Sequence, residues 1–480
     1  MSPESFLIFC GGRFIKTGQQ LKIRNPYNRE IAGITFMAGL PELETAIAEA
    51  LDAREPMRML ASFRRYEALM QIASGLENMK QLFAETICRE SAKPIRYALA
   101  EVDRSIQTFR VAAEESRRLP GEYLSIDWTV AGNGKEGWVK YFPVGIVAGI
   151  APFNFPLNLA VHKIAPAIAA GCPIILKPST STPLSTLLLA KIIDKAGLPK
   201  GAVSILPMDR TTGNNLVTDD RFSLLSFTGS PQVGWKMKAA AGRKKVVLEL
   251  GGNAGVIVTA SADLEKAVTQ CVNGAFSYSG QVCIHTQRIY VMKEIFREFA
   301  ERFVAKTGML KAGNPMDPAT DISVMIDEEN AGRVDSWVRE AVEGGSEILC
   351  GGRRIGSYYE PTVITNTKPG MNVCCSEIFG PVVVIEPVDS IRQAVDHVNQ
   401  GCYGLQAGIF TDSLGEMDFA FENFEVGGVI VNDVPTFRVD HMPYGGIKDS
   451  GYGREGVKYA MADMLEPRLL VKGKYSKSDI

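Results

Sequence analysis

The sequence has almost no excess of either charge. Its 480 residues include 52 Lys and Arg against 54 Asp and Glu, which gives a net charge of −2. Proteins that bind nucleic acid or anionic membranes electrostatically carry a basic surplus, and this chain has none. We therefore expect no nucleic-acid partner and no membrane partner. A local basic pocket for a small anion remains compatible with this balance.

Long uninterrupted hydrophobic runs are also missing. The longest stretch without a charged residue, 141–162, contains Pro143, Pro152 and Pro156. A membrane-spanning helix of about 20 residues would not be broken in this way, so a buried strand followed by an irregular loop is the better interpretation. The first ten residues lack the basic start and the long apolar core of a signal peptide. These features predict a cytoplasmic protein.

Cysteine and histidine are too scattered to predict a metal site. The chain has 9 cysteines, an odd number, and no two of them are spaced as Cys-x-x-Cys. This argues against zinc ribbons and thioredoxin-like redox motifs, and only 4 histidines remain as further ligands. We expect no metal, and mostly buried, reduced cysteines.

The sequence does contain a regular alternation of strand and helix patterns. Its length predicts two large domains, and its 46 glycines and 25 prolines indicate many tight connections. From 144 to 250, apolar strand candidates alternate with helix candidates, including a helix at 185–196 with Thr182 as its N-cap. A second alternation follows residue 250. This pattern predicts an α/β fold with two doubly wound, Rossmann-like domains.

Two further regions lie outside this alternation. The chain before it shows helical spacing at 41–54, 61–75 and 82–113. Residues 119–140 have an extended pattern with a hairpin turn signal at Gly132-Asn-Gly134, and 467–472 form a terminal extended segment. Exposed strands pair readily by strand addition, so both segments are candidates for subunit contacts.

Candidate chemistry lies at predicted strand-to-loop junctions, where α/β sheets bind their ligands. Cys283 follows a predicted helix. A thiol with a pKa of about 8.5 is mostly protonated at neutral pH, so Cys283 alone fits a buried cysteine as well as a nucleophile. His285 would point elsewhere in an extended segment, which weakens a papain-like Cys-His pair.

Three other segments have polar residues at such junctions. Glu249 ends a buried apolar strand, where burial raises a carboxyl pKa; a general base and a salt-bridged glutamate both fit. Asn154 lies in a proline-flanked loop, as an oxyanion donor or as a turn residue. The segments 177–180 and 227–230 follow strands, and a helix N-terminus with glycine backbone can hold a diphosphate. Neither segment matches the dinucleotide fingerprint or a complete P-loop.

Taken together and in this order, these segments resemble the NAD(P)-dependent aldehyde dehydrogenases. The resemblance runs from about Asn25 to the C-terminal segment. It includes the following motifs: Pro143-Val-Gly-Ile-Val, Pro166-Ala-Ile-Ala-Ala-Gly-Cys-Pro, Glu377-Ile-Phe-Gly-Pro381 and Pro443-Tyr-Gly-Gly-Ile-Lys-Asp-Ser-Gly-Tyr-Gly-Arg-Glu-Gly456. It implies oxidation of a small aldehyde with NADP or NAD.

The resemblance also implies residue roles and domains. Cys283 would form a thiohemiacetal and then a thioester, Glu249 would activate water, and Asn154 with the Cys283 N–H would hold the oxyanion. The matching cofactor positions are Ile150, Pro152, Phe153, Lys177, Ser179, Thr180, Gly213, Gly229, Ser230, Leu250, Gly251, Glu377 and Phe379. The family fold implies a cofactor-binding domain (1–118 and 141–248), a catalytic domain (249–452) and an oligomerisation arm (119–140 and 453–480), with homodimers or homotetramers.

One departure from the family pattern bears on the cofactor. Many NAD-preferring members carry a glutamate at the position of Thr180, and its carboxylate would repel the 2′-phosphate of NADP. The absence of this glutamate, with Lys177 and Ser179 nearby, predicts that NADP is accepted as well as NAD.

A second departure bears on the substrate. Val282 stands where members acting on phosphorylated aldehydes often carry arginine, and the positions of His162 and Ser277 lack the arginines of succinic-semialdehyde members. Small hydroxyaldehydes, such as lactaldehyde or glyceraldehyde, and simple semialdehydes are therefore favoured. The candidate substrate-binding residues are His162, His285, Arg438 and His441. Pairing of Arg438 with Asp440 or Glu455 is an equally good interpretation.

Three alternative functions remain open. CoA-acylating members usually lack the base at the position of Glu249, so its presence favours release of the free acid. A non-catalytic, cofactor-binding homologue need not keep Cys283, Glu249 and Asn154 together. A cysteine hydrolase acting on esters would share only the acyl-enzyme half of the reaction.

Overall fold

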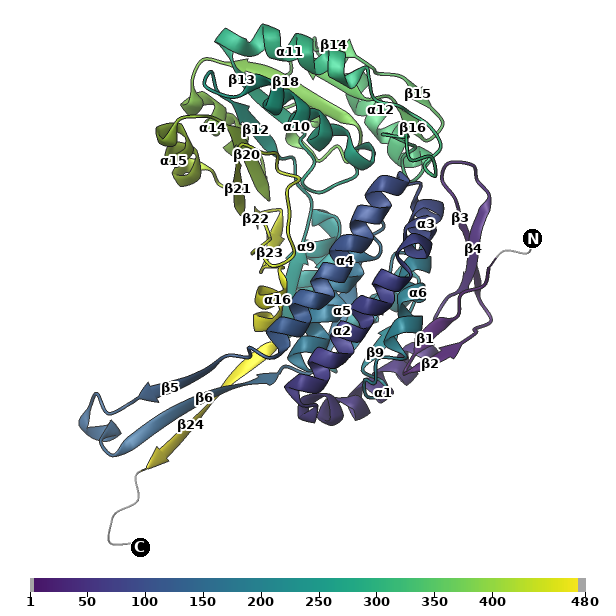
Figure 1. Cartoon of the computed structure of the whole chain (residues 1–480), viewed down its shortest axis with the longest axis vertical. Helices are drawn as coiled ribbons and strands as arrows, with labels where there is room; N and C mark the ends of the chain where they lie inside the picture. Colours follow the sequence, from purple (N-terminus) through teal and green to yellow (C-terminus); the bar gives the residue numbers. More distant parts are fainter. Residues whose placement is uncertain (1–3, 474–480) are drawn as a thin grey trace, which may run out of the picture.

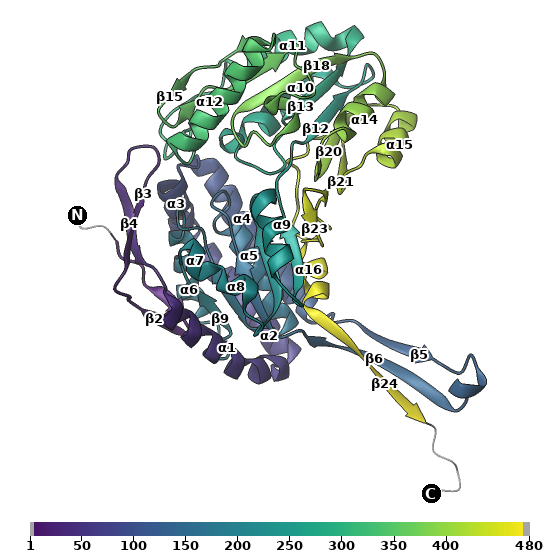
Figure 2. The ribbon, with the colours of Figure 1, turned by 180° about the vertical axis from the view of Figure 1, so that it is seen from behind.

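The computed structural model describes residues 4–473 as two lobes and a protruding arm (Figures 1 and 2). The first lobe is built on an eight-stranded sheet. Its five central strands run parallel, and the strands at its two edges run antiparallel to their neighbours. In spatial order, its strands are β2 (Arg13–Ile15), β1 (Ile8–Cys10), β9 (Val203–Ile205), β8 (Ile174–Lys177), β7 (Ile146–Ile150), β10 (Phe222–Thr228), β11 (Lys245–Glu249) and β23 (Gly451–Tyr452).

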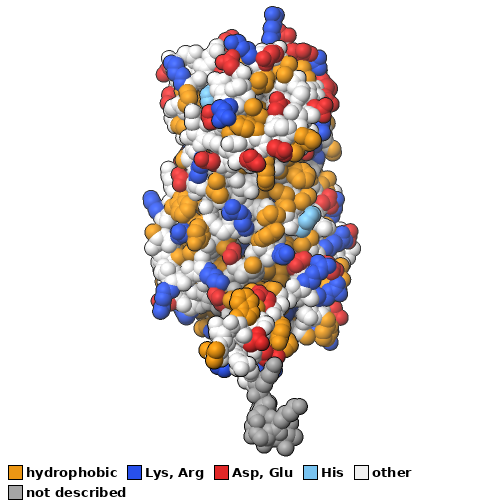
Figure 3. Space-filling view, turned by 90° about the vertical axis from the view of Figure 1, so that its left-hand side faces the viewer, with side chains coloured by type: hydrophobic (Ala, Val, Ile, Leu, Met, Phe, Trp, Pro, Cys, Tyr) orange, Lys and Arg blue, Asp and Glu red, His pale blue; other side chains and the backbone are white. Residues whose placement is uncertain are grey.

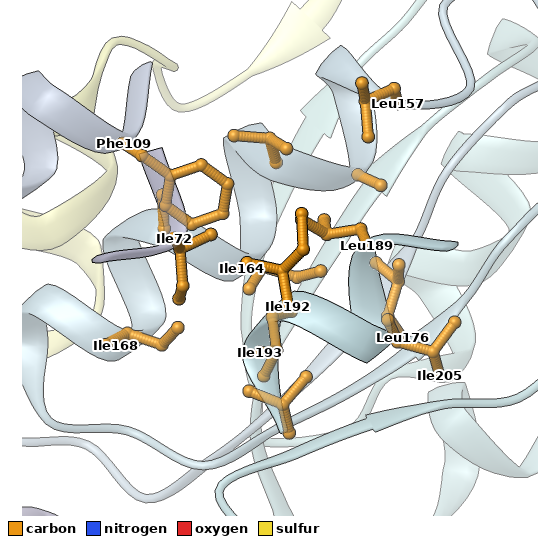
Figure 4. Close-up of a cluster of buried hydrophobic side chains, with 14 of the residues drawn as sticks. Ile72, Phe109, Leu157, Ile164, Ile168, Leu176, Leu189, Ile192, Ile193 and Ile205 are labelled. Atoms are coloured by element: carbon orange, nitrogen blue, oxygen red, sulfur yellow. The ribbon is translucent and has the colours of Figure 1, made fainter. Parts of the chain in front are cut away.

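Helices cover both faces of this sheet because its buried strands are apolar on both sides. Val147 packs into one hydrophobic cluster, whereas Ile146 and Ala148 pack into the other. Figure 4 shows part of the first cluster. That face is covered by α2 (Ser62–Asn78), α3 (Lys80–Ser91), α4 (Ile95–Ser116), α5 (Asn158–Ala170) and α6 (Leu184–Ile193). The other face is covered by α1 (Leu40–Met59), α8 (Asn215–Thr218) and α9 (Pro231–Ala240).

The second lobe repeats the same architecture on a seven-stranded sheet. All its strands run parallel except the edge strand β14. In spatial order, they are β14 (Glu347–Cys350), β17 (Thr362–Thr365), β18 (Val382–Val388), β13 (Arg288–Met292), β12 (Gly255–Val258), β20 (Gln406–Phe410) and β21 (Gly428–Val431). One face packs against α10 (Leu264–Phe276) and α11 (Lys293–Thr307), and the other against α12 (Glu328–Glu343), α14 (Ile391–Asn399) and α15 (Leu414–Asn423). The predicted α/β class is confirmed.

The arm is a three-stranded antiparallel sheet. The hairpin strands β5 (Gly121–Ser125) and β6 (Lys135–Pro143) are separated by the short helix η1 (Val130–Gly132), and β6 also pairs with the terminal strand β24 (Leu465–Gly473). Both extended segments expected from the sequence therefore meet in one sheet (Figure 1). The helix α16 (Val457–Asp463) packs on α4 and α5 instead, so these residues lie on the first lobe and not in the arm.

Short elements complete the chain. They are β3 (Gln20–Arg24), β4 (Ile31–Phe36), α7 (Arg210–Gly213), η2 (Ser277–Gly280), β15 (Arg354–Ile355), β16 (Tyr358–Tyr359), α13 (Asn372–Cys375), β19 (Tyr403–Gly404) and β22 (Ile447–Lys448). The four strands β1 to β4 lie before residue 41, in a region to which the sequence analysis assigned no elements.

One helical pattern is divided in the structure, and the expected cap of another helix was wrong. The helical pattern 82–113 forms two helices, because Ala92 adopts a left-handed conformation (φ 55°) and Pro94 follows. Thr182 does not cap α6; its hydroxyl donates to the carbonyl of Phe153 instead (3.3 Å). The buried carboxylate of Glu90, distant in sequence, accepts the first two N–H groups of α6 (2.6 and 3.1 Å).

The surface agrees with the balanced composition. Figure 3 shows lysines and arginines interspersed with acidic residues over one face of the molecule. Between residues 4 and 473, no helix combines the length and apolar composition needed to cross a membrane.

Candidate active site

The carboxyl ends of four parallel strands form a row in the first lobe. Ile150 at the end of β7 lies opposite Lys177 on β8 and Phe227 on β10, and Thr228 lies opposite Glu249 on β11. Because the strands are parallel and end together, the loops after them share one edge of the sheet. The segments 151–156, 177–180, 229–230 and 250–251 are thus brought together, and each follows a strand, as the sequence analysis expected.

The second lobe contributes the amino ends of two parallel strands. Cys283 lies between η2 and β13, and both Glu377 and Phe379 lie just before β18. Hydrogen bonds join these segments to the first lobe's sheet edge: Asn154 Nδ2 donates to the Gln281 carbonyl (3.0 Å), and the Gly252 N–H donates to Glu377 Oε1 (3.1 Å). Asn154 is therefore fixed against the loop that carries Cys283.

Glu249 is a buried carboxyl group that is not tied to a partner. It is 3% exposed, and neither carboxylate oxygen has a hydrogen-bond partner within the described residues. Burial, followed by the charge of Glu455, raises the pKa of Glu249 well above its usual value, although Arg438 and Lys163 oppose this. A side chain at Gly445 would lie 2.9 Å from Glu249 Oε1, so this glycine leaves space beside the carboxylate. The salt-bridged alternative for Glu249 is not what the structure shows.

Cys283 is partly exposed, and its sulfur contacts a tyrosine. The Sγ atom lies 3.1 Å from the hydroxyl of Tyr444, a residue that the sequence analysis did not single out. Burial raises the pKa of the Cys283 thiol to about 11, against the opposing effects of the Tyr444 hydrogen bond and the Arg438 charge. Within the described residues, the Cys283 backbone N–H makes no hydrogen bond, so it remains available as a donor.

A buried ionic cluster lies behind these residues. His162 contacts Asp440 (2.8 Å) and Glu455 (3.2 Å), and Glu455 also binds Arg438 (2.9 Å) and Lys163 (3.3 Å). Although burial raises the pKa of Glu455, Lys163, His162 and Arg438 together hold it well below its usual value. Arg438 and His162 are thus brought together. Arg438 is paired with Glu455, which is one of the two pairings that the sequence analysis considered.

The other two candidate substrate residues lie apart from this cluster. His285 is buried, and burial lowers the pKa of its ring to about 4; within the described chain, neither ring nitrogen has a hydrogen-bond partner. His441 is exposed. Neither histidine forms a hydrogen bond or ion pair with Cys283, Glu249 or Arg438 in the described part of the structure.

A second buried pair supports the loop that carries Asn154. Lys93 and Glu101 form an ion pair that is completely buried. The other oxygen of Glu101 accepts the N–H groups of Leu157 and Asn158 at the start of α5 (3.0 and 3.1 Å). The Lys93 ammonium lies 3.8 Å from the ring centre of Phe155, which follows Asn154. The sequence offered no signal for this pair, because Lys93 and Glu101 lie far in sequence from the loop that they support.

The first lobe's sheet edge fits a dinucleotide. The Lys177 side chain lies against Gly213, where a Cβ would be 2.9 Å from its stem, and burial lowers the pKa of its ammonium group. Ser230 is the N-cap of α9, but its side chain makes no cap bond and is free to bind a ligand. A Cβ at Gly251 would lie 2.3 Å from Glu377 Oε2, so a side chain there would displace the Glu377 carboxyl group.

Aromatic rings and a raised carboxyl pKa complete this region. Phe153 and Phe379 pack edge to face with ring centres 5.9 Å apart. Burial raises the pKa of Glu377 to about 7. Across residues 4–473, no group of three or more His, Cys, Asp or Glu side chains is placed to hold a metal ion.

Comparison with known proteins identifies the family. The model of the aldehyde dehydrogenase family matches residues 14–470. The chain belongs to the aldehyde dehydrogenase family. It is therefore an NAD(P)-dependent oxidoreductase that converts an aldehyde to the acid through a cysteine, and the resemblance noted from the sequence is confirmed.

Relatives within this family act on small aldehydes. A 3-sulfolactaldehyde dehydrogenase of Priestia megaterium is 42% identical over 98% of both chains, and a lactaldehyde dehydrogenase of Methanococcus aeolicus is 40% identical over 97% of this chain and 99% of its own. The structure of aldehyde dehydrogenase 21 from Physcomitrella patens, with the reaction product succinate, has a TM-score of 0.98 and is 45% identical, covering 99% and 100% of the two chains. A glyceraldehyde-3-phosphate dehydrogenase from Methanocaldococcus jannaschii with NADP has a TM-score of 0.91 and is 38% identical, covering 95% of this chain and 100% of its own.

Proposed function

We propose that Cys283, Glu249 and Asn154 carry out aldehyde oxidation in this protein. The Cys283 sulfur adds to the aldehyde carbon, and the resulting oxyanion accepts hydrogen bonds from the Asn154 amide and the Cys283 N–H. Bound NADP or NAD supplies the hydride acceptor. The observation that carries this assignment is the hydrogen bond from Asn154 to the Cys283 loop, together with the unpaired, buried carboxylate of Glu249.

Glu249 then releases the product. Because its pKa is raised, it binds a proton more readily than an ordinary carboxylate, and it takes a proton from water as the water oxygen adds to the thioester carbon. The carbon–sulfur bond breaks, the electron pair returns to the sulfur, and the carboxylic acid leaves. A base at this position favours hydrolysis over transfer to CoA.

The row of strand ends in the first lobe is the proposed cofactor site. Lys177, Ser179 and Thr180 would hold the adenosine ribose and its substituent, Ser230 with the start of α9 would hold the diphosphate, and Glu377 would hold the nicotinamide ribose. The remaining proposed contacts are Ile150, Pro152, Phe153, Gly213, Gly229, Leu250, Gly251 and Phe379. Thr180 brings no negative charge toward a 2′-phosphate, so we propose that NADP is used as well as NAD.

The proposed substrate is a small hydroxyaldehyde or semialdehyde. The relatives named for lactaldehyde and sulfolactaldehyde, and the neighbour with bound succinate, act on molecules of this size. Arg438 contributes a buried positive charge 3.6 Å above the Tyr444 ring, and Tyr444 contacts Cys283. This charge supports a substrate with a polar or anionic group opposite its aldehyde.

We also propose the domain roles and assembly that follow from this function. Residues 1–118 and 141–248 bind the cofactor, 249–452 provide most of the catalytic groups, and the arm of β5, β6 and β24 forms a homodimer or homotetramer. Exposed apolar side chains on the arm support this assembly: Tyr123, Trp128, Val130, Trp138, Leu469, Leu470 and Val471. All nine cysteines are free, which supports a reducing, cytoplasmic location.

A panel of small aldehydes tests the reaction. Formation of reduced cofactor would be measured for each aldehyde with NADP and with NAD, in the wild-type protein, in Cys283→Ser and in Cys402→Ser, which removes an exposed cysteine as a control. We expect turnover in the wild-type protein and in Cys402→Ser, and none in Cys283→Ser. Turnover retained in Cys283→Ser would contradict the proposal.

Two added conditions separate the alternative activities. Turnover that requires CoA would identify an acylating enzyme, and ester cleavage faster than aldehyde oxidation would identify a hydrolase. Cofactor binding without turnover on any aldehyde would indicate a non-catalytic homologue.

A further inference from the structure

The reactive sulfur has one side-chain hydrogen-bond partner in the described part of the chain. Tyr444 Oη lies 3.1 Å from Cys283 Sγ, and both groups are at the point where the two lobes meet. We propose that Tyr444 is a further catalytic residue, whose hydroxyl donates a hydrogen bond to the Cys283 thiolate. This inference rests on the proposed role of Cys283 and extends it to a residue of the segment 443–456.

The surroundings of Tyr444 keep its hydroxyl protonated. The residue is 3% exposed, and burial, followed by the charges of Cys283 and Glu249, raises its pKa well above the usual value. A protonated phenol beside a thiolate can only donate, because the thiolate has no proton to offer. The direction of the hydrogen bond therefore favours the nucleophilic form of the cysteine.

Arg438 strengthens this donor. Its guanidinium carbon lies 3.6 Å from the centre of the Tyr444 ring, while its Nη2 is held by Glu455 at 2.9 Å. A positive charge over the ring face draws electron density from the phenol, so the hydroxyl becomes a better donor. The charged and titratable groups that act on the Cys283 sulfur are Tyr444, Arg438, Glu377 and Glu249.

No histidine takes this role in the described structure. His162 is held by Asp440 and Glu455, His285 is buried without a partner for its ring, and His441 is exposed. His397 packs against Tyr290 in the second lobe. The tyrosine hydroxyl is therefore the side-chain donor that the fold provides for the sulfur.

This hydrogen bond acts at two points of the proposed cycle. It increases the fraction of thiolate before attack on the aldehyde. It also stabilises the negative sulfur when the carbon–sulfur bond of the thioester breaks and the electron pair returns to Cys283. Both effects are lost when the hydroxyl is removed and the ring is kept.

Alkylation of Cys283 by iodoacetamide, followed against pH, tests the proposal in the full-length protein. The rate would be measured from the peptide that contains Cys283 by mass spectrometry, with Cys283→Ser identifying that peptide. In Tyr444→Phe we expect the pH midpoint to rise by about one to two units and the rate at pH 7 to fall about tenfold or more. An unchanged midpoint in Tyr444→Phe would overturn the proposal.

A control and a second variant make the result specific. Tyr359→Phe removes a different buried tyrosine hydroxyl, which lies in the second lobe and has no partner among the described residues, and should leave the midpoint unchanged. Arg438→Lys keeps the charge but loses the planar group over the ring, and should raise the midpoint by less than Tyr444→Phe. A midpoint in Arg438→Lys at or below that of the wild-type protein would contradict the part assigned to Arg438.

Alkylation requires no turnover, so the two proposals fail separately. A protein that oxidises no aldehyde would refute the proposed function, whereas the alkylation profile would still decide whether Tyr444 stabilises the thiolate.

Discussion

Burial sets the chemistry of the individual residues at this site. Glu249 and Glu455 are both buried carboxyl groups near Lys163, but their pKa values shift in opposite directions. Glu455 is bound directly by Lys163, His162 and Arg438 and stays charged, whereas neither oxygen of Glu249 has a hydrogen-bond partner in the described residues. Glu249 therefore accepts a proton much more readily than Glu455 does.

Glu249→Gln should separate the two halves of the reaction. The first turnover should still release about one equivalent of reduced cofactor per site, because thioester formation does not use this base. Steady-state turnover should then fall by about 10²–10⁴-fold, since no group activates water. A rapid-mixing assay of cofactor reduction would show a burst followed by a slow phase. Loss of the burst together with the steady state would argue against this role.

The same carboxyl should control the pH dependence. Because the pKa of Glu249 is raised, the group is protonated and inactive below that pKa and becomes a base as the pH rises through it. We expect the wild-type steady-state rate to increase with pH across a midpoint well above 4.5, the unperturbed value. The slow residual rate of Glu249→Gln should not show this increase with pH. An increase that persists in the variant would have to come from another titrating group.

Thr180 is the residue at which we expect cofactor preference to change. In Thr180→Glu, a carboxylate would repel the 2′-phosphate of NADP and accept the ribose hydroxyls of NAD. The ratio of kcat/KM for NADP to that for NAD should fall by about tenfold or more, which corresponds to about 1.4 kcal/mol. Thr180→Gln, of similar size but neutral, is the control and should change the ratio less. A wild-type preference for NAD above about a hundredfold would refute the expected use of NADP.

At the scale of elements, two helices of the first lobe begin on buried glutamates from elsewhere in the chain. Glu90 accepts the first N–H groups of α6, and Glu101 accepts those at the start of α5. The first N–H groups of a helix have no partner within it, so the carboxyl oxygens of these two side chains satisfy them. These contacts fix α5 directly after the loop that carries Asn154.

Glu90→Gln should loosen the start of α6. The amide keeps one acceptor oxygen but loses the other, which costs about 1–2 kcal/mol of local stability. Amide hydrogen exchange in the peptide covering 184–193 should therefore become about 5–30 times faster. Glu77→Gln, at an exposed residue on α2, should leave this peptide unchanged. Equal protection in Glu90→Gln and wild type would show that the carboxylate does not hold the helix.

At the scale of the whole molecule, the arm is the feature that supports the proposed assembly. It extends away from both lobes (Figures 1 and 2), and within residues 4–473 its terminal strand β24 is an edge strand. Trp128 and Val130 at its tip are 89% and 95% exposed. An isolated three-stranded sheet with this much apolar surface is stabilised when a second copy covers it.

Leu469→Glu should disrupt that assembly. Leu469 is exposed on β24, and a buried carboxylate in a subunit interface would be unpaired and costly. Sedimentation velocity should show a smaller species than for the wild-type protein at the same concentration. Leu414→Glu, at an exposed leucine on α15, is the matched control and should sediment like wild type. A monomeric wild-type protein would refute the proposed assembly.

The sequence by itself determined the α/β class, because apolar periodicity and flanking residues act locally. It also placed candidate chemistry at the ends of predicted strands, because parallel strands align their carboxyl ends. Through the family motifs it pointed to Cys283, Glu249 and Asn154, whose roles remain proposals.

Only the tertiary structure decided which groups meet. Tyr444 and Cys283 are separated by 161 residues, and His162 and Glu455 by 293. The replacement of Thr182 by Glu90 at the start of α6, and the support of the Asn154 loop by Lys93 and Glu101, likewise depend on contacts between distant segments. Local patterns carry no information about such pairs, since burial and pKa are set by whatever the folded chain packs beside each group.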